Sequence, residues 1–318
     1  MNTRNSQLKE KISKKAQSLG FSLIAFTDAK ISQIHSKAYK NFLKNDMSGD
    51  LDYLKNSDAR LDPNNILPEL KTVICLATNY FHEQKTLGKD SGRIARYAYG
   101  RDYHKIIKKR LVILEEYIRS ILPESKTRSF VDAVPFLERA FAEKSGLGII
   151  GKNSCLITKK YGSWVFLSEI LLNKKITPDK IQSGKTFDIC GSCELCMQVC
   201  PNKAIISPGI VDPMKCLSFW TIENKSEKIP AKIKKILKET NTLFGCDKCQ
   251  ECCPHNSRAI PVKDKAFKKP KIAGDEQNVN KLLAIKDEEE FLKKFAGSAF
   301  TRAKFKGIKR NAKAIRKK

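Results

Sequence analysis

The sequence predicts an α/β (α+β) domain followed by a smaller, metal-organised module, and three observations lead to this prediction. Strand-like and helix-like stretches alternate along residues 1–184, which is the pattern of a layered domain of helices and sheet. Nine of the 11 cysteines then fall between residues 190 and 254. The hydrophobic content of 41% is enough for a globular core. We therefore expect domains at residues 1–184 and 185–260, and a helical, basic C-terminal segment at 261–318.

Periodicity and turn residues predict the elements in chain order. Apolar positions at helical spacing, often followed by glycine or proline, predict helices over residues 7–19, 31–45, 103–122 and 137–148. Apolar runs, many of them rich in β-branched residues, predict strands over residues 21–29, 72–79, 129–135, 154–158 and 163–172. Past residue 261 the chain becomes rich in lysine, and one acidic helix is expected over residues 287–295.

The chain is strongly basic, with 61 Lys and Arg against 34 Asp and Glu and a net charge of +27. Such a charge creates a positive potential that attracts a polyanion. Residues 300–318 hold nine basic residues and no acidic one, and Phe305 and Ile308 give part of this run the pattern of an amphipathic helix. The run is either a solubilising end or a surface for nucleic-acid phosphates, since it has few large apolar side chains for a membrane surface.

The sequence argues against several classes of protein. No apolar run approaches the roughly 20 residues of a membrane span. Residues 1–15 are polar and charged, unlike a secretory signal. Disulfide-rich scaffolds are usually short and secreted, so clustered cysteines in this chain indicate metal ligation instead. We expect a cytoplasmic protein that does not bind a membrane.

The first cysteine run has the spacing of a bacterial ferredoxin. Cys190, Cys193, Cys196 and Cys200 follow the pattern C-x2-C-x2-C-x3-C, and Pro201 comes next. In this pattern the first three thiolates bind one [4Fe–4S] cluster, and the fourth binds the other cluster of a two-cluster protein. The sequence therefore predicts a second cluster.

A second run supplies the ligands of that cluster. Cys246, Cys249 and Cys253 precede a proline, and Cys216 stands alone between the two runs. If the Cys-Pro thiolates cross, cluster 1 takes Cys190, Cys193, Cys196 and Cys253, and cluster 2 takes Cys200, Cys246, Cys249 and one more. That last ligand is either Cys216 or Cys252, and the awkwardness of adjacent thiolates on two clusters favours Cys216. Paired C-x2-C units also make zinc ribbons, but the ferredoxin spacing favours iron–sulfur clusters.

Two clusters conduct electrons but bind small organic substrates poorly, so we expect a second cofactor in the first domain. No G-x-G-x-x-G follows a strand, and no phosphate-binding P-loop is present. Asp102 and His104 have the spacing of a cobalt-ligand motif, but Ile107 stands where glycine should follow, so His104 is not assigned to cobalt. The two remaining cysteines, Cys75 and Cys155, lie in apolar stretches and are expected in the core.

Several stretches together resemble the epoxyqueuosine reductase family. They are GRDYHKIIKKRL (100–111), VDAVPFLERAFAEKSGLGIIGKNS (131–154), GSWVFLSEILL (162–172), CGSCELCMQVCP (190–201), CLSFWTIE (216–223) and GCDKCQECCPHN (245–256). The resemblance implies a cobalamin-dependent iron–sulfur enzyme of tRNA modification, with a cobalamin-binding reductase domain and a ferredoxin-like domain. It implies reduction of epoxyqueuosine to queuosine at the wobble position of tRNA, with electrons passing through two [4Fe–4S] clusters to cobalamin. It also implies Cys216 as the eighth ligand.

The same resemblance implies roles for individual residues. In the segment V-D-x-x-P-x-x-E-R, Asp132 is the acid that protonates the leaving epoxide oxygen. Its alternative role is a cap for the following helix, which Pro135 makes a poorer fit. The implied cobalamin contacts are Lys55, Ala95, Asp132, Asn153, Leu156, Phe219, Lys248 and Cys249. The implied substrate and tRNA contacts are Tyr97, Asp102, Tyr103, His104 and Asn224. Asp102 could instead cap the helix over residues 103–122.

The expected partners are tRNA and a low-potential electron donor, and the expected state is a monomer. One alternative is a cobalamin-dependent, reductive dehalogenase-like reductase of a small electrophile. It would share the clusters and cobalamin, but such enzymes typically have an export signal and no need of a charge of +27. Another alternative is a plain two-cluster electron-transfer protein, which leaves the first domain and Asp132 without a role.

Overall fold

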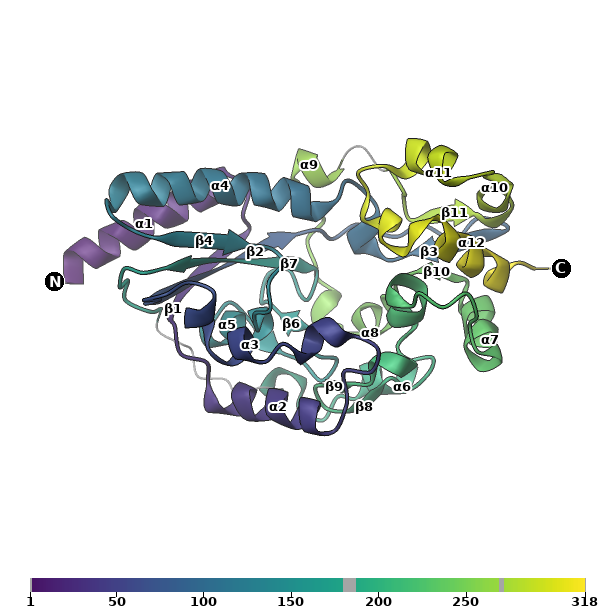
Figure 1. The fold of residues 1–318 in the computed structure, drawn as a ribbon, viewed down its shortest axis with the longest axis horizontal. Helices are drawn as coiled ribbons and strands as arrows, with labels where there is room; N and C mark the ends of the chain where they lie inside the picture. Colours follow the sequence, from purple (N-terminus) through teal and green to yellow (C-terminus); the bar gives the residue numbers. More distant parts are fainter. Residues whose placement is uncertain (1, 180–186, 269–271, 318) are drawn as a thin grey trace. The chain divides into compact units, whose positions relative to one another are not determined.

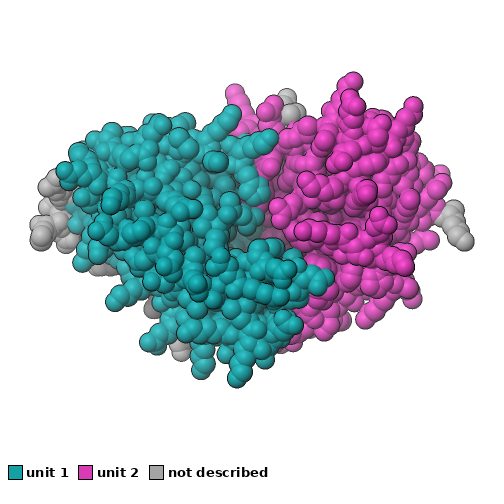
Figure 2. Space-filling view, in the orientation of Figure 1, with its two compact units in different colours: residues 1–79, 104–192 teal, residues 80–103, 193–318 magenta. Residues whose placement is uncertain are grey.

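The computed structural model of the chain describes residues 2–179, 187–268 and 272–317 (Figure 1). The chain folds into two compact units, which Figure 2 colours separately. Unit 1 contains residues 1–79 and 104–192, and unit 2 contains residues 80–103 and 193–318. The units differ from the boundaries predicted from sequence, because one hydrophobic core in unit 2 joins residues from 80–103, the cysteine-rich segment and the C-terminal segment.

Unit 1 is built on a four-stranded sheet with the order β1–β2–β7–β4. The strands are β1 (Leu23–Asp28), β2 (Thr72–Asn79), β7 (Val165–Leu172) and β4 (Thr127–Phe130). Every neighbouring pair is antiparallel, so the alternation of strands and helices gives an α+β sheet rather than a parallel α/β sheet. All of β2 is buried, because it is an apolar, β-branched run in the interior of the sheet.

Helices cover both faces of this sheet. The helices α1 (Asn2–Ser18) and α4 (Tyr103–Ile121) lie on one side in Figure 1, and α5 (Glu138–Lys144) lies on the other. The predicted apolar face of α4 is buried, since Ile107 and Leu114 are both 0% exposed. The core beneath α5 contains Phe130, Phe136, Phe141 and Cys75. The remaining elements are α2 (Gln33–Lys44), α3 (Asp58–Leu61) and the hairpin β5 (Ile149–Ile150) and β6 (Leu156–Ile157).

Unit 2 combines a small sheet with many short helices. Its three-stranded sheet has the order β10 (Thr242–Phe244), β3 (Ser91–Ile94) and β11 (Glu276–Asn278). The hairpin is β8 (Ile205–Ser207) and β9 (Ile210–Val211). The helices are α6 (Leu195–Val199), α7 (Ala231–Thr240), α8 (Lys248–Glu251), α9 (Lys265–Lys268), α10 (Val279–Ala284), α11 (Glu288–Phe295) and α12 (Lys304–Ile315). In Figure 1, α7 and α12 are neighbours, and they pack together.

The structure corrects several of the predicted elements. The strand predicted over 129–135 ends at Phe130, because the backbone turns into the left-handed region at Asp132 (φ 50°). The strand predicted over 154–158 is reduced to the two residues of β6, and Cys155 lies before it, only partly buried. Cys75 lies in the core, as predicted. The basic C-terminal run forms α12, which buries Ile308, Ala312 and Ile315 against unit 2. That helix is therefore part of the core as well as a charged surface.

Candidate functional site

The acid predicted from sequence lies in a loop of unit 1 directly after β4. Asp132 has a φ of 50°, an uncommon conformation for a residue other than glycine. Its backbone N–H donates a hydrogen bond to Oε1 of Glu138 over 2.9 Å. Its side chain is 62% exposed, and Oδ2 lies 3.7 Å from Nε2 of His104. The Asp132 backbone is thus held by α5, and its carboxyl group stays accessible to a substrate.

Asp132 does not cap the helix that follows it. The N-cap position of α5 is Leu137, and no side chain caps this helix end. The alternative role considered from sequence is therefore not the one seen. His104, predicted as a substrate contact, is the residue of α4 that lies beside Asp132. The structure brings these two predicted residues together.

Two glutamates with raised pKa values lie near Asp132, and the sequence interpretation missed both. Glu138 is the first residue of α5, and burial raises its pKa to about 8, with the nearby Asp132 adding to the shift. Glu169 is 0% exposed in β7, and its pKa is raised well above its usual range by burial and by Glu138. Both lie within stretches that carry the family resemblance, but only the fold indicates their burial.

Three of the cysteines predicted for cluster 2 come together in unit 2. Burial raises the pKa of Cys246 to about 12, and the neighbouring Cys216 and Cys200 contribute to the shift. Burial also raises the pKa of Cys216, again with a contribution from Cys200. A thiol in such surroundings keeps its proton unless a positive centre such as cluster iron replaces it. Sγ of Cys200 also accepts a hydrogen bond from the backbone N–H of Ala204 over 3.1 Å.

Cys252 lies among ligands predicted for cluster 1. Burial raises its pKa, and the neighbouring Cys253 and Cys193 add to the shift. Its thiol also donates to the backbone carbonyl of Cys249 over 3.6 Å. In unit 1, the predicted ligand Cys190 ends a short turn, and its Sγ accepts a hydrogen bond from the N–H of Lys152 over 3.4 Å. Among the described residues, no group of three or more His, Cys, Asp or Glu is arranged to hold a single metal ion.

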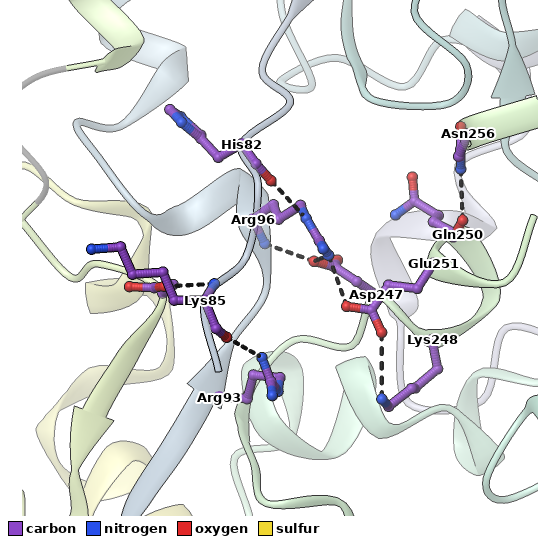
Figure 3. A network of polar contacts seen from close by, with 10 residues as sticks. His82, Lys85, Arg93, Arg96, Asp247, Lys248, Gln250, Glu251 and Asn256 are labelled. Carbon is purple, nitrogen blue, oxygen red and sulfur yellow. Dashed lines mark hydrogen bonds and ion pairs between the residues drawn. The ribbon is translucent and has the colours of Figure 1, made fainter. Parts of the chain in front are cut away.

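A buried arginine supports the second cysteine run (Figure 3). The guanidinium of Arg96 donates to Asp247 over 3.1 Å, to Glu251 over 2.8 Å and to the carbonyl of His82 over 3.0 Å. Its backbone N–H also donates to Asp247 over 2.8 Å. Glu251 in turn pairs with Lys248 at 3.4 Å. These contacts connect the segment before Tyr97 to the loop that bears Cys246 and Cys249.

The residues predicted to contact cobalamin divide evenly between the units. In unit 1, Lys55 pairs with Asp52 at 2.8 Å, and the buried Asn153 accepts a hydrogen bond from the N–H of Cys155 over 3.1 Å. Leu156 is buried, and Asp132 has been described above. In unit 2, the predicted contacts are Ala95, Phe219, Lys248 and Cys249. Ala95 and Phe219 are buried, and the N–H of Ala95 donates to the carbonyl of Phe244 over 2.8 Å.

Two loops that carry these predicted contacts are closely packed. A side chain on Gly151 would lie 2.6 Å from Ile157 and 3.1 Å from Asn153. A side chain on Gly245, whose φ is 69°, would lie 2.5 Å from the Cβ of Ala95. Both glycines therefore allow close packing within the protein at these loops.

The remaining predicted contacts occupy unit 2 and the start of α4. Tyr97 packs edge-on against Tyr103, with ring centres 6.2 Å apart, and the N–H of Asp102 donates to the carbonyl of Gly297 over 2.7 Å. Asn224 follows the short π-helix at Phe219–Glu223, and its carbonyl accepts a hydrogen bond from Arg310 of α12 over 2.8 Å. The C-terminal helix thus holds the loop of one predicted tRNA contact.

Comparisons with known protein families match two parts of the chain. Residues 60–133 match the family model "Epoxyqueuosine reductase QueG, DUF1730". Residues 189–256 match the model "4Fe-4S double cluster binding domain". An epoxyqueuosine reductase of Cellulophaga algicola is 38% identical over 318 residues, which cover 98% of each chain. One from Pseudomonas aeruginosa is 33% identical over 96% of this chain and 84% of its own.

Solved structures of epoxyqueuosine reductases are also similar to this chain. A crystal structure of epoxyqueuosine reductase with an epoxyqueuosine-modified stem loop of tyrosine tRNA has a TM-score of 0.86 and 28% identity, covering 98% of this chain and 81% of its own. An epoxyqueuosine reductase from Bacillus subtilis, described with its catalytic aspartate loop swung out of the active site, has a TM-score of 0.82 and 29% identity at the same coverage. In the described residues, no helix is long and apolar enough to cross a membrane.

Proposed function

The chain belongs to the epoxyqueuosine reductase family, and we propose that it reduces epoxyqueuosine to queuosine in tRNA. The observation that carries this function is the match to a curated relative over 98% of both chains. A match of that extent includes the reductase part and the cysteine-rich part together. It favours the complete reaction over electron transfer alone.

Electrons enter through two [4Fe–4S] clusters. We assign Cys190, Cys193, Cys196 and Cys253 to cluster 1 and Cys200, Cys216, Cys246 and Cys249 to cluster 2. The proximity of Cys216 to Cys200 and Cys246 supports its assignment as the eighth ligand. Cys252 lies instead near Cys193 and Cys253, whose cluster already has four ligands in this assignment. Cys252 is therefore a neighbour of cluster 1 and not a ligand of cluster 2.

Cobalamin is the cofactor that would receive these electrons. When bound, it supplies a cobalt centre that can deliver electrons at low potential to the epoxide. Asn153, Leu156, Ala95 and Phe219 would contact it. Lys55, Lys248 and Cys249 would contribute further contacts.

Asp132 supplies a proton to the oxygen that leaves the epoxide. Its backbone is held at Glu138 and its carboxyl group is accessible, which are the properties that a general acid needs to meet a bound substrate. His104 lies beside the carboxyl group and would orient it. Tyr97, Asp102 and Tyr103 would line the approach of the nucleoside.

The tRNA would be held mainly through its phosphates. The net charge of +27 supplies sequence-independent attraction, and the exposed lysines of α7 and α12 are arranged on neighbouring helices. The wobble base has to leave its stack to reach the reductase site, as single-stranded bases commonly do when proteins bind them. Asn224 would contact the loop. Such an enzyme would act in the cytoplasm as a monomer, supplied by a low-potential electron donor.

The test is conversion of the modified nucleoside. The protein, with its clusters reconstituted, would be incubated without oxygen with a strong reductant and tRNA that carries epoxyqueuosine, with and without cobalamin. Nucleoside mass spectrometry should detect loss of one oxygen mass only when cobalamin is present. If cobalamin binds and the clusters are intact but the nucleoside is unchanged, the substrate is another electrophile.

A further inference from the structure

The proposed reaction needs two protons, and Asp132 is the proposed donor of the first. Both C–O bonds of the epoxide break, a C=C bond forms, and the oxygen leaves as water, which consumes two electrons and two protons. The electrons come from the low-potential donor through the clusters. Once Asp132 has protonated the oxygen it is a carboxylate, so another group must supply the second proton. This inference therefore rests on the proposed function.

Glu138 is an acidic residue beside Asp132. Its Oε1 accepts the backbone N–H of Asp132 over 2.9 Å, so the two residues are in direct contact. It begins α5, which covers the face of the sheet that bears Cys75 and Phe130. The other charged groups that act on Glu138 are Arg139 and His104, and both favour its ionised form.

Glu169 lies on the same face of the sheet. In the strand register it stands opposite Cys75 of β2 and Phe130 of β4, and residues directly opposite each other in a sheet project to one face. The side chains of Cys75 and Phe130 are in the core beneath α5. Glu169 is 0% exposed, and within the described part of the chain neither of its carboxyl oxygens has a hydrogen-bond partner.

A buried carboxylate without a partner is costly, whereas a buried carboxylic acid is tolerated far better. The groups that act on Glu169 are Glu138 and Asp132, which are also acidic and therefore favour its neutral form. Burial and the nearby Asp132 likewise raise the pKa of Glu138 to about 8. The two glutamates thus have the protonation state that a proton store requires at neutral pH.

We propose that Glu138 and Glu169 form an acid pair that holds the second proton of the reaction and returns it to Asp132. After Asp132 has given its proton to the epoxide oxygen, a proton passes from the Glu138 carboxyl group to the Asp132 carboxylate. Asp132 then forms the second O–H bond of the departing water. Glu169 restores the proton of Glu138, and solvent restores the pair between turnovers.

The first test measures protonation without substrate. Carbon-13 NMR of protein labelled at the glutamate carboxyl carbons would be followed as pH rises, with signals assigned by their loss in Glu138→Gln and Glu169→Gln. Both signals should titrate well above the ordinary glutamate value of about 4.3. Titration of both near the ordinary value overturns the acid pair, whatever the substrate is.

The second test measures conversion of epoxyqueuosine tRNA against pH. Glu138→Gln keeps an oxygen that accepts the Asp132 N–H but cannot carry the proton. We expect conversion about tenfold slower at neutral pH, with the alkaline decline moved to lower pH. The matched control is Glu143→Gln, which removes another carboxylate of α5, one that accepts hydrogen bonds from His35 and Ile150. Its profile should stay that of the wild type.

The outcomes separate the two claims. If the wild type does not convert the nucleoside, the proposed function fails, and the NMR titration still decides whether the acid pair exists. If the wild type converts it, and Glu138→Gln and Glu169→Gln both keep the wild-type rate and pH profile, the proton-storing role is wrong. A lower rate with an unchanged profile would leave Glu138 as a positioning residue only, and would also overturn the proposal.

Discussion

The cysteine module of unit 2 and the acid site of unit 1 use burial in opposite ways. Burial raises the pKa of Cys246 to about 12 and that of Glu138 to about 8. In the module the proton has to be displaced by iron, because only a thiolate binds a cluster. In the proposed acid site the proton has to be kept, because that site would deliver it. The same physical effect therefore opposes formation of the thiolate in one region and favours the protonated glutamate in the other.

The two regions also differ in how the chain assembles them. The ligands of the module come mostly from two short runs, in which spacing alone brings the thiols near one another. The acid site draws His104 from α4, Asp132 from the loop after β4, Glu138 from α5 and Glu169 from β7. The module therefore depends on local spacing, and the acid site depends on the whole sheet.

The largest effect should follow from removing one ligand of cluster 2. In Cys246→Ser, iron should fall from about eight atoms to about four per chain, and conversion should be lost, because the electron path is broken. Iron and sulfide analysis of anaerobically reconstituted protein measures the iron content, and nucleoside mass spectrometry measures the conversion.

The matched control is Cys252→Ser, a neighbouring cysteine in the same loop. It should keep about eight iron atoms and the wild-type rate, since cluster 2 is assigned to Cys216 instead. The opposite pattern, with Cys216→Ser neutral and Cys252→Ser short of iron, would reverse the ligand assignment.

A smaller effect should come from the arginine that supports the module. Arg96→Met leaves Asp247 buried without its cation, so the free energy of unfolding should fall by about 3 kcal/mol. Arg93→Met is the control, because the guanidinium of Arg93 donates only a long hydrogen bond of 3.5 Å, to the carbonyl of Lys85, within the described residues. It should change stability by no more than about 0.5 kcal/mol.

Chemical unfolding of the cluster-loaded protein without oxygen would measure both variants. An unfolding free energy of Arg96→Met equal to that of the wild type would mean that the metal clusters alone determine the shape of the cysteine loop. That result would remove the network in Figure 3 from the account of how unit 2 is stabilised.

The smallest effect concerns tRNA affinity. Replacing Lys234 and Lys238 on the exposed face of α7 by glutamine should weaken binding severalfold and lower the salt slope by about 1 for each lysine that contacts a phosphate. Lys14→Gln on α1 removes a lysine that is already paired with Glu10, and it should leave the slope unchanged. Binding titrations at several salt concentrations measure this, and equal slopes in all variants would place the tRNA elsewhere.

The sequence predicted the cysteine spacing, the buried strand over 72–79 and the helix over 103–122, because each is encoded within one short stretch. It could not predict that 80–103 and 261–318 join the cysteine-rich segment, because that depends on strand pairing between β3, β10 and β11. It also could not predict that Glu169 is buried without a hydrogen-bond partner among the described residues. The sequence shows a glutamate in an apolar strand, but the residues that surround it come from β2, β4 and α5.

The most direct test compares wild type with Asp132→Asn, both loaded with clusters and cobalamin, on tRNA that carries epoxyqueuosine. Asp90→Asn is the matched control, since Asp90 is also exposed and also has a positive φ of 55°. Wild type and control should remove one oxygen mass, and Asp132→Asn should do so at least about a hundredfold more slowly with unchanged iron and cobalamin content. Equal rates in all three proteins would contradict the claim that unit 1 delivers the proton through Asp132.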